Sequence, residues 1–374
     1  MQRLLVIFAL LALAAFLMKK PDKPAYDATV CAGPPLRSTG ERNQAMEDGY
    51  AIHPRYGCID KASFDAVQAD RKEWNAAQEA RANEEREAMA EAGATTFAQQ
   101  RHGFTTTIAV QDSSAPPLPS PPATLFVRSD YKNASNYMLP GYVTPDPQDG
   151  QRHPAIIWIT GGDSNSLGDF WTPGPDSNDQ SARAFREAGM IMAFPTLRGG
   201  NGGRSKKEFF YGEVDDILSA AAQLARLRYV DPERIYLGGH STGGTLALLT
   251  AATRTPFRAI FAFGPVASVD RYTPSLIPVD FSQHDPLELK LRSPVHWLDD
   301  IENPTYIIEG VSGSGNRADL ETLCAATRNP AVHCIPVHGS DHFSVIRPVT
   351  RLIAERLTTA PTAEFSLQAE EFSQ

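Results

Sequence analysis

An alternation of short apolar runs with helical patterns between residues 155 and 357 most constrains the fold. Patterns of helical period, such as 213–229 and 242–253, stand between apolar runs at residues 155–160, 190–194, 234–238, 258–263, 305–309 and 332–337. Parallel strands need a long crossover, usually a helix, which buries both faces of their sheet. The pattern therefore predicts an α/β fold, with a mostly parallel sheet covered by helices on both faces.

A serine lies in a tight turn between one of these runs and a helical pattern. The segment Gly239-His240-Ser241-Thr242-Gly243 fits G-x-S-x-G and is followed by the apolar residues 245–249. Such a turn lifts the serine hydroxyl above the sheet, and the positive end of the next helix favours an oxyanion. We predict that Ser241 is a nucleophile and that the backbone N–H of Thr242 is one oxyanion donor.

A serine hydroxyl becomes a good nucleophile when a base takes its proton. His342 follows the last predicted strand and precedes a helical pattern at 346–357, so we predict that it is this base. His338 and Asp341 lie beside it, but no second group of ligands accompanies them. We therefore expect neither a metal nor a cofactor, and we interpret His240 as an ordinary polar position.

Three further segments resemble the catalytic domain of the prolyl oligopeptidase family of serine peptidases. They are FPTLRGGNGG at 194–203, FYGEVDD at 210–216 and VDPERIY at 230–236. The resemblance implies an α/β-hydrolase fold. It also implies cleavage of a peptide or ester bond through an acyl-enzyme on Ser241, and a structural role for Arg198.

The sequence departs from this family in three ways. The chain before residue 123 is too short and too helical for the β-propeller of the best-known members. The oxyanion-hole tyrosine that follows the first buried strand has no counterpart at 160–164, so we assign the second oxyanion donor to the amide of Gly162 or Asp163. Gly313 stands where the family carries its catalytic aspartate.

The catalytic acid must therefore come from elsewhere. Some hydrolases of this fold place it after the preceding strand, where Asp270 lies, and we choose Asp270, with Asp319 and Glu309 as alternatives. A triad without its acid keeps only part of its rate enhancement. The alternative function is therefore a non-catalytic binding protein on a hydrolase scaffold.

Residues 275–297 lie between two predicted core strands, and we predict that they cap the pocket. Their apolar side chains would form a subsite for an acyl group or a substrate side chain, or belong to the core. These side chains are Phe281, Leu287, Leu289 and Trp297.

The N-terminus carries an apolar run from Leu4 to Met18, which ends at two lysines without the small residues of a signal cleavage site. We expect a membrane anchor or a signal segment that exports the catalytic domain. The expected division of the chain is 1–20 for this segment, 21–112 for a helical region with a long helix at 61–93, 113–122 for a proline-rich linker, 123–359 for the hydrolase domain, and 360–374 for a polar tail.

The cysteines and the net charge indicate which cellular environment and which kinds of partner to expect. The four cysteines form two local pairs, Cys31 with Cys58 and Cys324 with Cys334. Two disulfides would suit an exported protein, while buried thiols are the alternative for the second pair. The net charge of −9 and the absence of a basic run argue against a nucleic-acid partner. The expected partners are a small ester or peptide substrate, and the membrane through the N-terminal segment.

Overall fold

The computed structural model describes residues 50–53, 57–60, 95–112, 114–201, 203, 205–359 and 365–372. The chain divides into two units, Met1–Ala80 and Arg81–Gln374. In the first, the described part is an antiparallel hairpin of β1 (Tyr50–His53) and β2 (Gly57–Asp60). The predicted segment at 1–20, the predicted helix at 61–93 and Cys31 lie outside the described residues. Among the helices that are described, none is long and apolar enough to cross a membrane.

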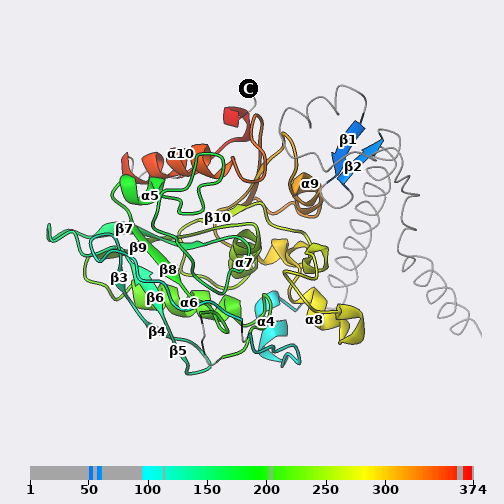
Figure 1. Cartoon of the computed structure of the whole chain (residues 1–374), viewed down its shortest axis with the longest axis horizontal. Coiled ribbons are helices and arrows are strands. Elements are labelled where there is room, and N and C mark those ends of the chain that lie inside the picture. The colour runs from blue at the N-terminus through cyan, green and yellow to red at the C-terminus, as the bar shows by residue number, and fades with distance from the viewer. Residues whose placement is uncertain are drawn as a thin grey trace, which may run out of the picture. The chain divides into compact units, whose positions relative to one another are not determined.

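An eight-stranded sheet forms the centre of the second unit (Figure 1), in the order β12-β11-β10-β9-β7-β8-β6-β3. Neighbouring strands from β8 to β12 pair in parallel, whereas β6 and β3 pair antiparallel at one edge. The mostly parallel sheet predicted from the sequence is therefore confirmed. Its strands are β3 (Val127–Arg128), β6 (Gly141–Val143), β7 (His153–Ile159), β8 (Ile191–Pro195), β9 (Val230–His240), β10 (Ile260–Phe263), β11 (Thr305–Gly310) and β12 (Val332–Val337).

Helices and smaller elements surround this sheet. A two-stranded sheet pairs β4 (Tyr131–Lys132) with β5 (Met138–Leu139). The α-helices are α4 (Phe97–His102), α5 (Ala184–Glu187), α6 (Glu213–Leu224), α7 (Thr242–Ala251), α8 (Pro286–Lys290), α9 (Arg317–Ala325) and α10 (Ile346–Thr359). The 3₁₀ turns are η1 (Val269–Arg271), η2 (Phe281–Gln283), η3 (Pro294–His296), η4 (Leu298–Asp300) and η5 (Ala369–Phe372).

The two faces of the sheet belong to two separate hydrophobic clusters. Successive strand residues point to opposite faces, so Ile157 packs with α6, α7 and α9 while its neighbour Ile156 packs with α5 and α10. The same alternation separates Leu237 from Tyr236 in β9. Helices therefore cover both faces, as the apolar runs predict.

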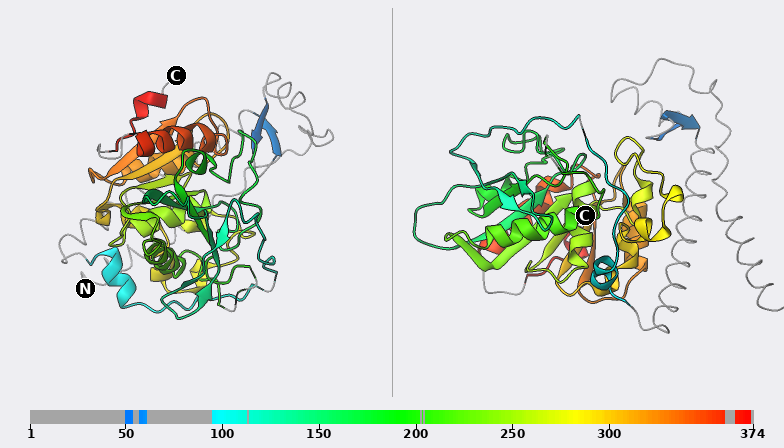
Figure 2. Two further views of the ribbon diagram at one scale, coloured as in Figure 1. Left: turned by 90° about the vertical axis from the view of Figure 1, so that its left-hand side faces the viewer. Right: turned by 90° about the horizontal axis from the view of Figure 1, so that it is seen from below.

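Residues 95–112 pack against the hydrolase part of the second unit (Figure 2). Phe97 of α4 is fully buried, with its ring centroid 5.2 Å from that of Trp297. Val110 forms an antiparallel bridge with Lys207. The proline-rich segment that follows also lies on the protein surface, where the Asn201 side chain donates a hydrogen bond to the carbonyl of Pro117.

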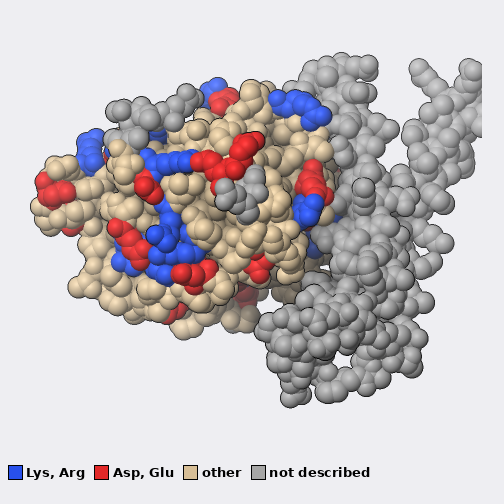
Figure 3. All heavy atoms as spheres, turned by 90° about the horizontal axis from the view of Figure 1, so that it is seen from above, with Lys and Arg blue, Asp and Glu red and all other residues tan. Residues whose placement is uncertain are grey.

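Near the C-terminus, residues 365–372 pack on the body as well. Leu367 is buried, and the Tyr306 hydroxyl donates to the carbonyl of Phe365. On the face shown in Figure 3, basic and acidic side chains lie next to one another. The ion pair of Arg347 with Glu187 is one example of this mixing on the surface.

A disulfide joins Cys324 in α9 to Cys334 in β12. The sequence left a disulfide and buried thiols as alternatives for this pair, and the structure has the disulfide. Disulfides of this kind are typical of proteins in oxidising compartments.

Removing this disulfide should destabilise the hydrolase unit. The bond closes a loop with a sequence separation of 10 residues, and the chain-entropy model gives a loop of that size about 3 kcal/mol. The double variant Cys324→Ser, Cys334→Ser is therefore expected to lose about 2 to 3 kcal/mol of unfolding free energy in urea. Reduction of the wild type should produce the same loss, and a reduced wild type as stable as the oxidised one would contradict the expectation.

Candidate active site

Ser241 lies in the turn between β9 and α7, with φ 55° and ψ −114°. A positive φ is strained for a residue with a side chain, and it persists only where surrounding contacts enforce it. One such contact is the Ser241 N–H, which donates to the Phe263 carbonyl at 2.8 Å. Another is the close approach of β7 to α7, because a Cβ on Gly243 would stand 2.1 Å from the Ile159 carbonyl oxygen. The strand–turn–helix setting predicted for Ser241 is therefore present.

The candidate oxyanion donors lie at the start of α7 and in the loop after β7. The amide of Thr242 has no acceptor within the helix, because the first N–H groups of a helix have none. The Thr242 hydroxyl donates to the Gly162 carbonyl at 3.0 Å and so holds the loop beside the turn. The Asp163 side chain pairs with Lys207, whose Nζ lies 2.8 Å from its Oδ1, and this contact does not involve the backbone amide that was predicted as a donor. Thr242 and Gly162 are thus brought together as predicted residues of one site.

Glu309 is the carboxylate beside His342. Its two oxygens lie 3.2 and 3.1 Å from Nδ1 of His342, and the Asn316 N–H donates to Oε1 at 3.0 Å. Glu309 is fully buried at the end of β11, where an unpaired carboxylate would be costly. Since Nδ1 faces a carboxylate, we assign the ring proton to Nδ1, which leaves the lone pair of Nε2 free to accept a proton.

The prediction of Asp270 as the partner of His342 is wrong. Asp270 is exposed on η1 and accepts a hydrogen bond from the Ser268 hydroxyl. Asp319 is buried, but its Oδ1 pairs with Arg271 at 2.5 Å. Glu309 reaches the imidazole because it lies within the strand, four positions before Gly313, where the family resemblance led us to expect an acid.

Two glycines make room for this pair. A Cβ on Gly264 would stand 2.4 Å from Cε1 of His342 and 2.6 Å from Oε2 of Glu309. A Cβ on Gly315 would stand 2.3 Å from Oε1 of Glu309. Any side chain at either position would therefore push the carboxylate and the imidazole apart. Because β9, β10 and β11 are adjacent and parallel, their carboxyl ends bring Ser241, Gly264 and Glu309 to one edge of the sheet.

His240 is not an ordinary polar position, as the sequence suggested, but a fully buried link between two loops. Its Nε2 lies 2.8 Å from the His342 carbonyl and must donate to it, so its Nδ1 accepts from the Gln180 amide at 2.8 Å. The side-chain oxygen Oε1 of Gln180 in turn accepts a hydrogen bond from the Gly161 N–H at 3.1 Å. This chain of hydrogen bonds connects the loop of the candidate base with the loop of the candidate oxyanion donors.

Burial, followed by the nearby His342, lowers the pKa of His240 from 6.5 to about 3. His240 is therefore neutral in the folded protein and takes up a proton more readily when the protein unfolds. Its contribution to stability is complete above the unfolded pKa and is lost progressively as the pH falls below it. Between about pH 8 and about pH 5 the loss should be about 2 kcal/mol of unfolding free energy.

Urea denaturation at both pH values measures this loss. Between these two pH values, the unfolding free energy of His240→Gln should decrease by about 2 kcal/mol less than that of the wild type. His338→Gln, at an exposed histidine, should show the same decrease as the wild type. An equal decrease in the His240 variant and the wild type would show that His240 is not held neutral.

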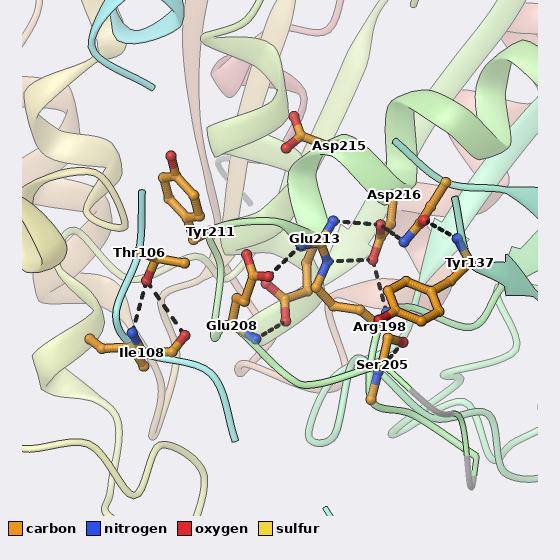
Figure 4. Close-up of polar contacts among 12 residues, drawn as sticks. Thr106, Ile108, Tyr137, Arg198, Ser205, Glu208, Tyr211, Glu213, Asp215 and Asp216 are labelled. Carbon is orange, nitrogen blue, oxygen red and sulfur yellow. Dashed lines mark hydrogen bonds and ion pairs between the residues drawn. The ribbon is translucent and has the colours of Figure 1, made fainter. Parts of the chain in front are cut away.

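Arg198 belongs to a buried polar network (Figure 4). Its Nε and Nη2 donate to the two oxygens of Asp216 at 3.0 and 2.8 Å, and its Nη1 pairs with Glu208 at 2.7 Å. Asn133 also donates to Asp216, at 2.9 Å. The guanidinium thus joins the loop after β8 to α6. These contacts agree with the structural role that the family resemblance implies for Arg198.

Residues 275–297 lie between β10 and β11, but their largest side chains belong to the core. Phe281 and Trp297 are buried, and the Trp297 indole donates to the Lys290 carbonyl at 2.8 Å. Leu287 and Leu289 pack at the edge of the same hydrophobic cluster. Of the two alternatives, the structure therefore has the core for Phe281 and Trp297, and the Trp297 ring contacts Phe97 of α4.

A cavity of about 270 Å³ lies at the outer part of this segment. It is open to solvent and is lined by two stretches of chain that are far apart in sequence. The residues that line it are Thr107, Ile108, Ala109, Val110, Pro278, Val279, Asp280, Gln283 and His284. Within the described part of the chain, no group of three or more His, Cys, Asp or Glu side chains is placed to hold a metal ion.

The sheet order, the strained serine turn and the histidine–carboxylate pair define an α/β-hydrolase fold. Residues 176–310 match the prolyl oligopeptidase family. A dipeptidyl-peptidase 5 of Porphyromonas gingivalis is 31% identical over 106 residues, which make up 27% of this chain and only 15% of that peptidase. The resemblance read from the sequence is thus confirmed over residues 176–310, the part of the chain that matches this family.

Solved structures show the same fold at low identity. A prolyl endopeptidase aligns with a TM-score of 0.51 and 19% identity, over 66% of this chain and 40% of its own length. A 2,6-dihydroxy-pseudo-oxynicotine hydrolase aligns with a TM-score of 0.51 and 20% identity, over 66% of this chain and 72% of its own length. The acylaminoacyl peptidase of Pyrococcus horikoshii aligns with a TM-score of 0.51 and 16% identity, over 67% of this chain and 44% of its own length. These structures share the α/β-hydrolase fold with this chain.

Proposed function

We propose that this protein is a serine hydrolase that cleaves a peptide or ester bond through an acyl-enzyme on Ser241. The observation that carries the proposal is the Glu309–His342 pair, whose imidazole lies 4.5 Å, centroid to centroid, from that of His240, the residue before Ser241 in the strained turn. A buried carboxylate, an imidazole and a hydroxyl in this order are the parts of a catalytic triad, which is recognised by geometry rather than by sequence position.

In the proposed reaction, Oγ of Ser241 attacks the substrate carbonyl carbon while its proton moves to Nε2 of His342. Glu309 accepts the hydrogen bond from Nδ1–H and stabilises the imidazolium that forms. The amides of Thr242 and of Gly162 or Asp163 bind the oxyanion. The imidazolium then gives its proton to the leaving amine or alkoxide, and a water molecule repeats the sequence to release the acid and restore Ser241.

A binding protein that has lost its catalytic acid is the alternative function. Its basis is the glycine at position 313, where the family has an aspartate. Glu309 supplies a carboxylate to His342 from another position, so this reason for the alternative no longer applies.

Reaction with a fluorophosphonate probe is the direct test of an activated serine. We expect the full chain to be labelled stoichiometrically and Ser241→Ala to remain unlabelled, because the probe reacts only with a serine whose proton a base can take. A folded wild type that resists the probe would favour the binding protein over the hydrolase.

A matched pair of carboxylate variants tests the choice of acid. Glu309→Gln should lower kcat for an activated ester by roughly 10³- to 10⁴-fold, as expected when the carboxylate that orients a catalytic histidine becomes an amide. Asp270→Asn should leave kcat unchanged, because Asp270 is exposed and bonded to Ser268. A larger loss of kcat in Asp270→Asn than in Glu309→Gln would indicate that Asp270 is the catalytic acid.

A further inference from the structure

The side chain of Gln180 lies between the loop of the candidate oxyanion donors and the end of β9, where the nucleophile turn begins. Its Oε1 accepts a hydrogen bond from the Gly161 N–H at 3.1 Å, and its Nε2 lies 2.8 Å from Nδ1 of His240. His240 directly precedes Ser241 in the sequence. The proposed reaction has so far assigned no task to this amide.

The protons of this network can be placed by starting from the groups that only donate or only accept. A backbone N–H only donates, so the oxygen of the Gln180 amide faces Gly161 and its nitrogen faces His240. Of the two N–H bonds on that nitrogen, one goes to Nδ1 of His240 and the other to Oδ1 of Asn178 at 2.8 Å. Nδ1 therefore carries a lone pair, and the ring proton is on Nε2, which donates to the His342 carbonyl at 2.8 Å. Gln180 thus fixes the tautomer of His240.

The segment Gly161-Gly162 is held at both of its ends. Gln180 accepts from the Gly161 N–H, and the Thr242 hydroxyl donates to the Gly162 carbonyl at 3.0 Å. The segment also lies against the candidate nucleophile, because a Cβ on Gly161 would stand 3.2 Å from Cβ of Ser241. A shift at either end would therefore move these peptide groups relative to Ser241.

Of the two candidate donors in this loop, the geometry favours the amide of Gly162. In a trans peptide group the N–H points opposite to the C=O. The Gly162 carbonyl points at the Thr242 hydroxyl, so the Asp163 N–H in the same peptide group points away from that hydroxyl. The Gly162 N–H belongs to the preceding peptide group, which lies between the two bonds that Gln180 and Thr242 make.

The backbone of Gln180 is itself anchored to the sheet. Its carbonyl accepts from the indole N–H of Trp158 at 3.0 Å, and Trp158 is fully buried in β7. The preceding residue, Asp179, is also fully buried and pairs with Arg183 at 3.2 Å. The side-chain amide therefore extends from a fixed point of the backbone towards the two loops.

We propose that Gln180 is a positioning residue, which aligns the amide of Gly162 with the oxyanion that forms when Ser241 attacks the substrate. Without the Gln180 side chain, the Gly161 N–H would lose its acceptor, and the donor loop would be free to move away from the developing charge. Gln180 acts through these backbone groups and takes part in no proton transfer, so the reaction balances unchanged. The inference rests on the proposed function.

The variant Gln180→Met removes both hydrogen bonds and keeps the length of the side chain. With a p-nitrophenyl ester, the pre-steady-state rate constant of acylation should fall by about 10- to 100-fold, because a misplaced oxyanion donor loses most of its effect. The dissociation constant of the ester should change little. The preference for this ester over its thionoester, in which sulfur replaces the carbonyl oxygen, should fall as well. Sulfur is larger and a weaker hydrogen-bond acceptor, so this preference measures how well the donors are aligned with oxygen.

Two further variants at this position separate alignment from a loss of structure. Gln180→Asn keeps an amide but is one methylene shorter, so it cannot reach both Gly161 and His240 and should acylate as slowly as Gln180→Met. It carries the same comparison if Gln180→Met does not fold. Gln180→Glu keeps the length and an oxygen for the Gly161 N–H. At about pH 6, a proton shared between its carboxyl group and His240 restores the second bond, so this variant should keep most of the wild-type rate at that pH.

Gln151→Met is the matched control outside the site. This exposed glutamine precedes β7 at the amino end of the strand, whereas the candidate site lies at the carboxyl ends of the strands. The control should acylate at the wild-type rate. Unfolding midpoints of all variants, measured in urea, allow the rates to be compared at equal folded fraction.

Failure of the inference can be told apart from failure of the proposed function. Fluorophosphonate labelling of the wild type together with wild-type acylation in Gln180→Met would overturn the inference and leave the serine hydrolase standing. Slow acylation with an unchanged preference for the ester over the thionoester would also overturn it, because the donors would then be aligned without Gln180. So would a Gln180→Glu variant as slow as Gln180→Met. A folded wild type that is not labelled would overturn both the inference and the proposed function.

Discussion

The buried carboxylate of Glu309 is the constraint on which the arrangement of this site depends. A charge at the end of a central strand must be paired, and the residues that surround this one come from three separate loops. Nδ1 of His342 and the Asn316 N–H take its oxygens, while Gly264 and Gly315 leave the space that the pair occupies. The loops after β10, β11 and β12 are thus fixed together around one carboxylate.

The same edge of the sheet carries a second set of bonds that includes no charge. His240 adjoins Ser241 in sequence, and it connects the His342 carbonyl through Gln180 to the amide of Gly161. Each of these groups is a buried or half-buried polar atom with a partner, so moving one loop would leave the others unsatisfied. A serine strained at positive φ can persist in such surroundings, because the neighbouring loops have little freedom to relax.

Segments remote from the candidate site are joined to it by packing. Glu288 and Arg292 form a fully buried ion pair, which also bonds Thr106 from the N-terminal side and the Glu208 carbonyl from the loop after β8. Two residues beyond Glu208, Phe210 stacks on Tyr272. Residues 95–112 therefore belong to the same structural unit as the site.

The sequence by itself determined the parallel sheet, the place of Ser241 and the loop of His342, because each has a local signature: apolar runs, a G-x-S-x-G turn between strand and helix, and a loop between the last strand and the last helix. Only the tertiary structure decided which groups Glu309, His240 and Gln180 contact. Glu309 reads in sequence as the end of a strand, and Gln180 as part of a connecting loop. Their significance depends on which strand ends meet in space and on how far each side chain reaches, and neither property is encoded in the local pattern of residues.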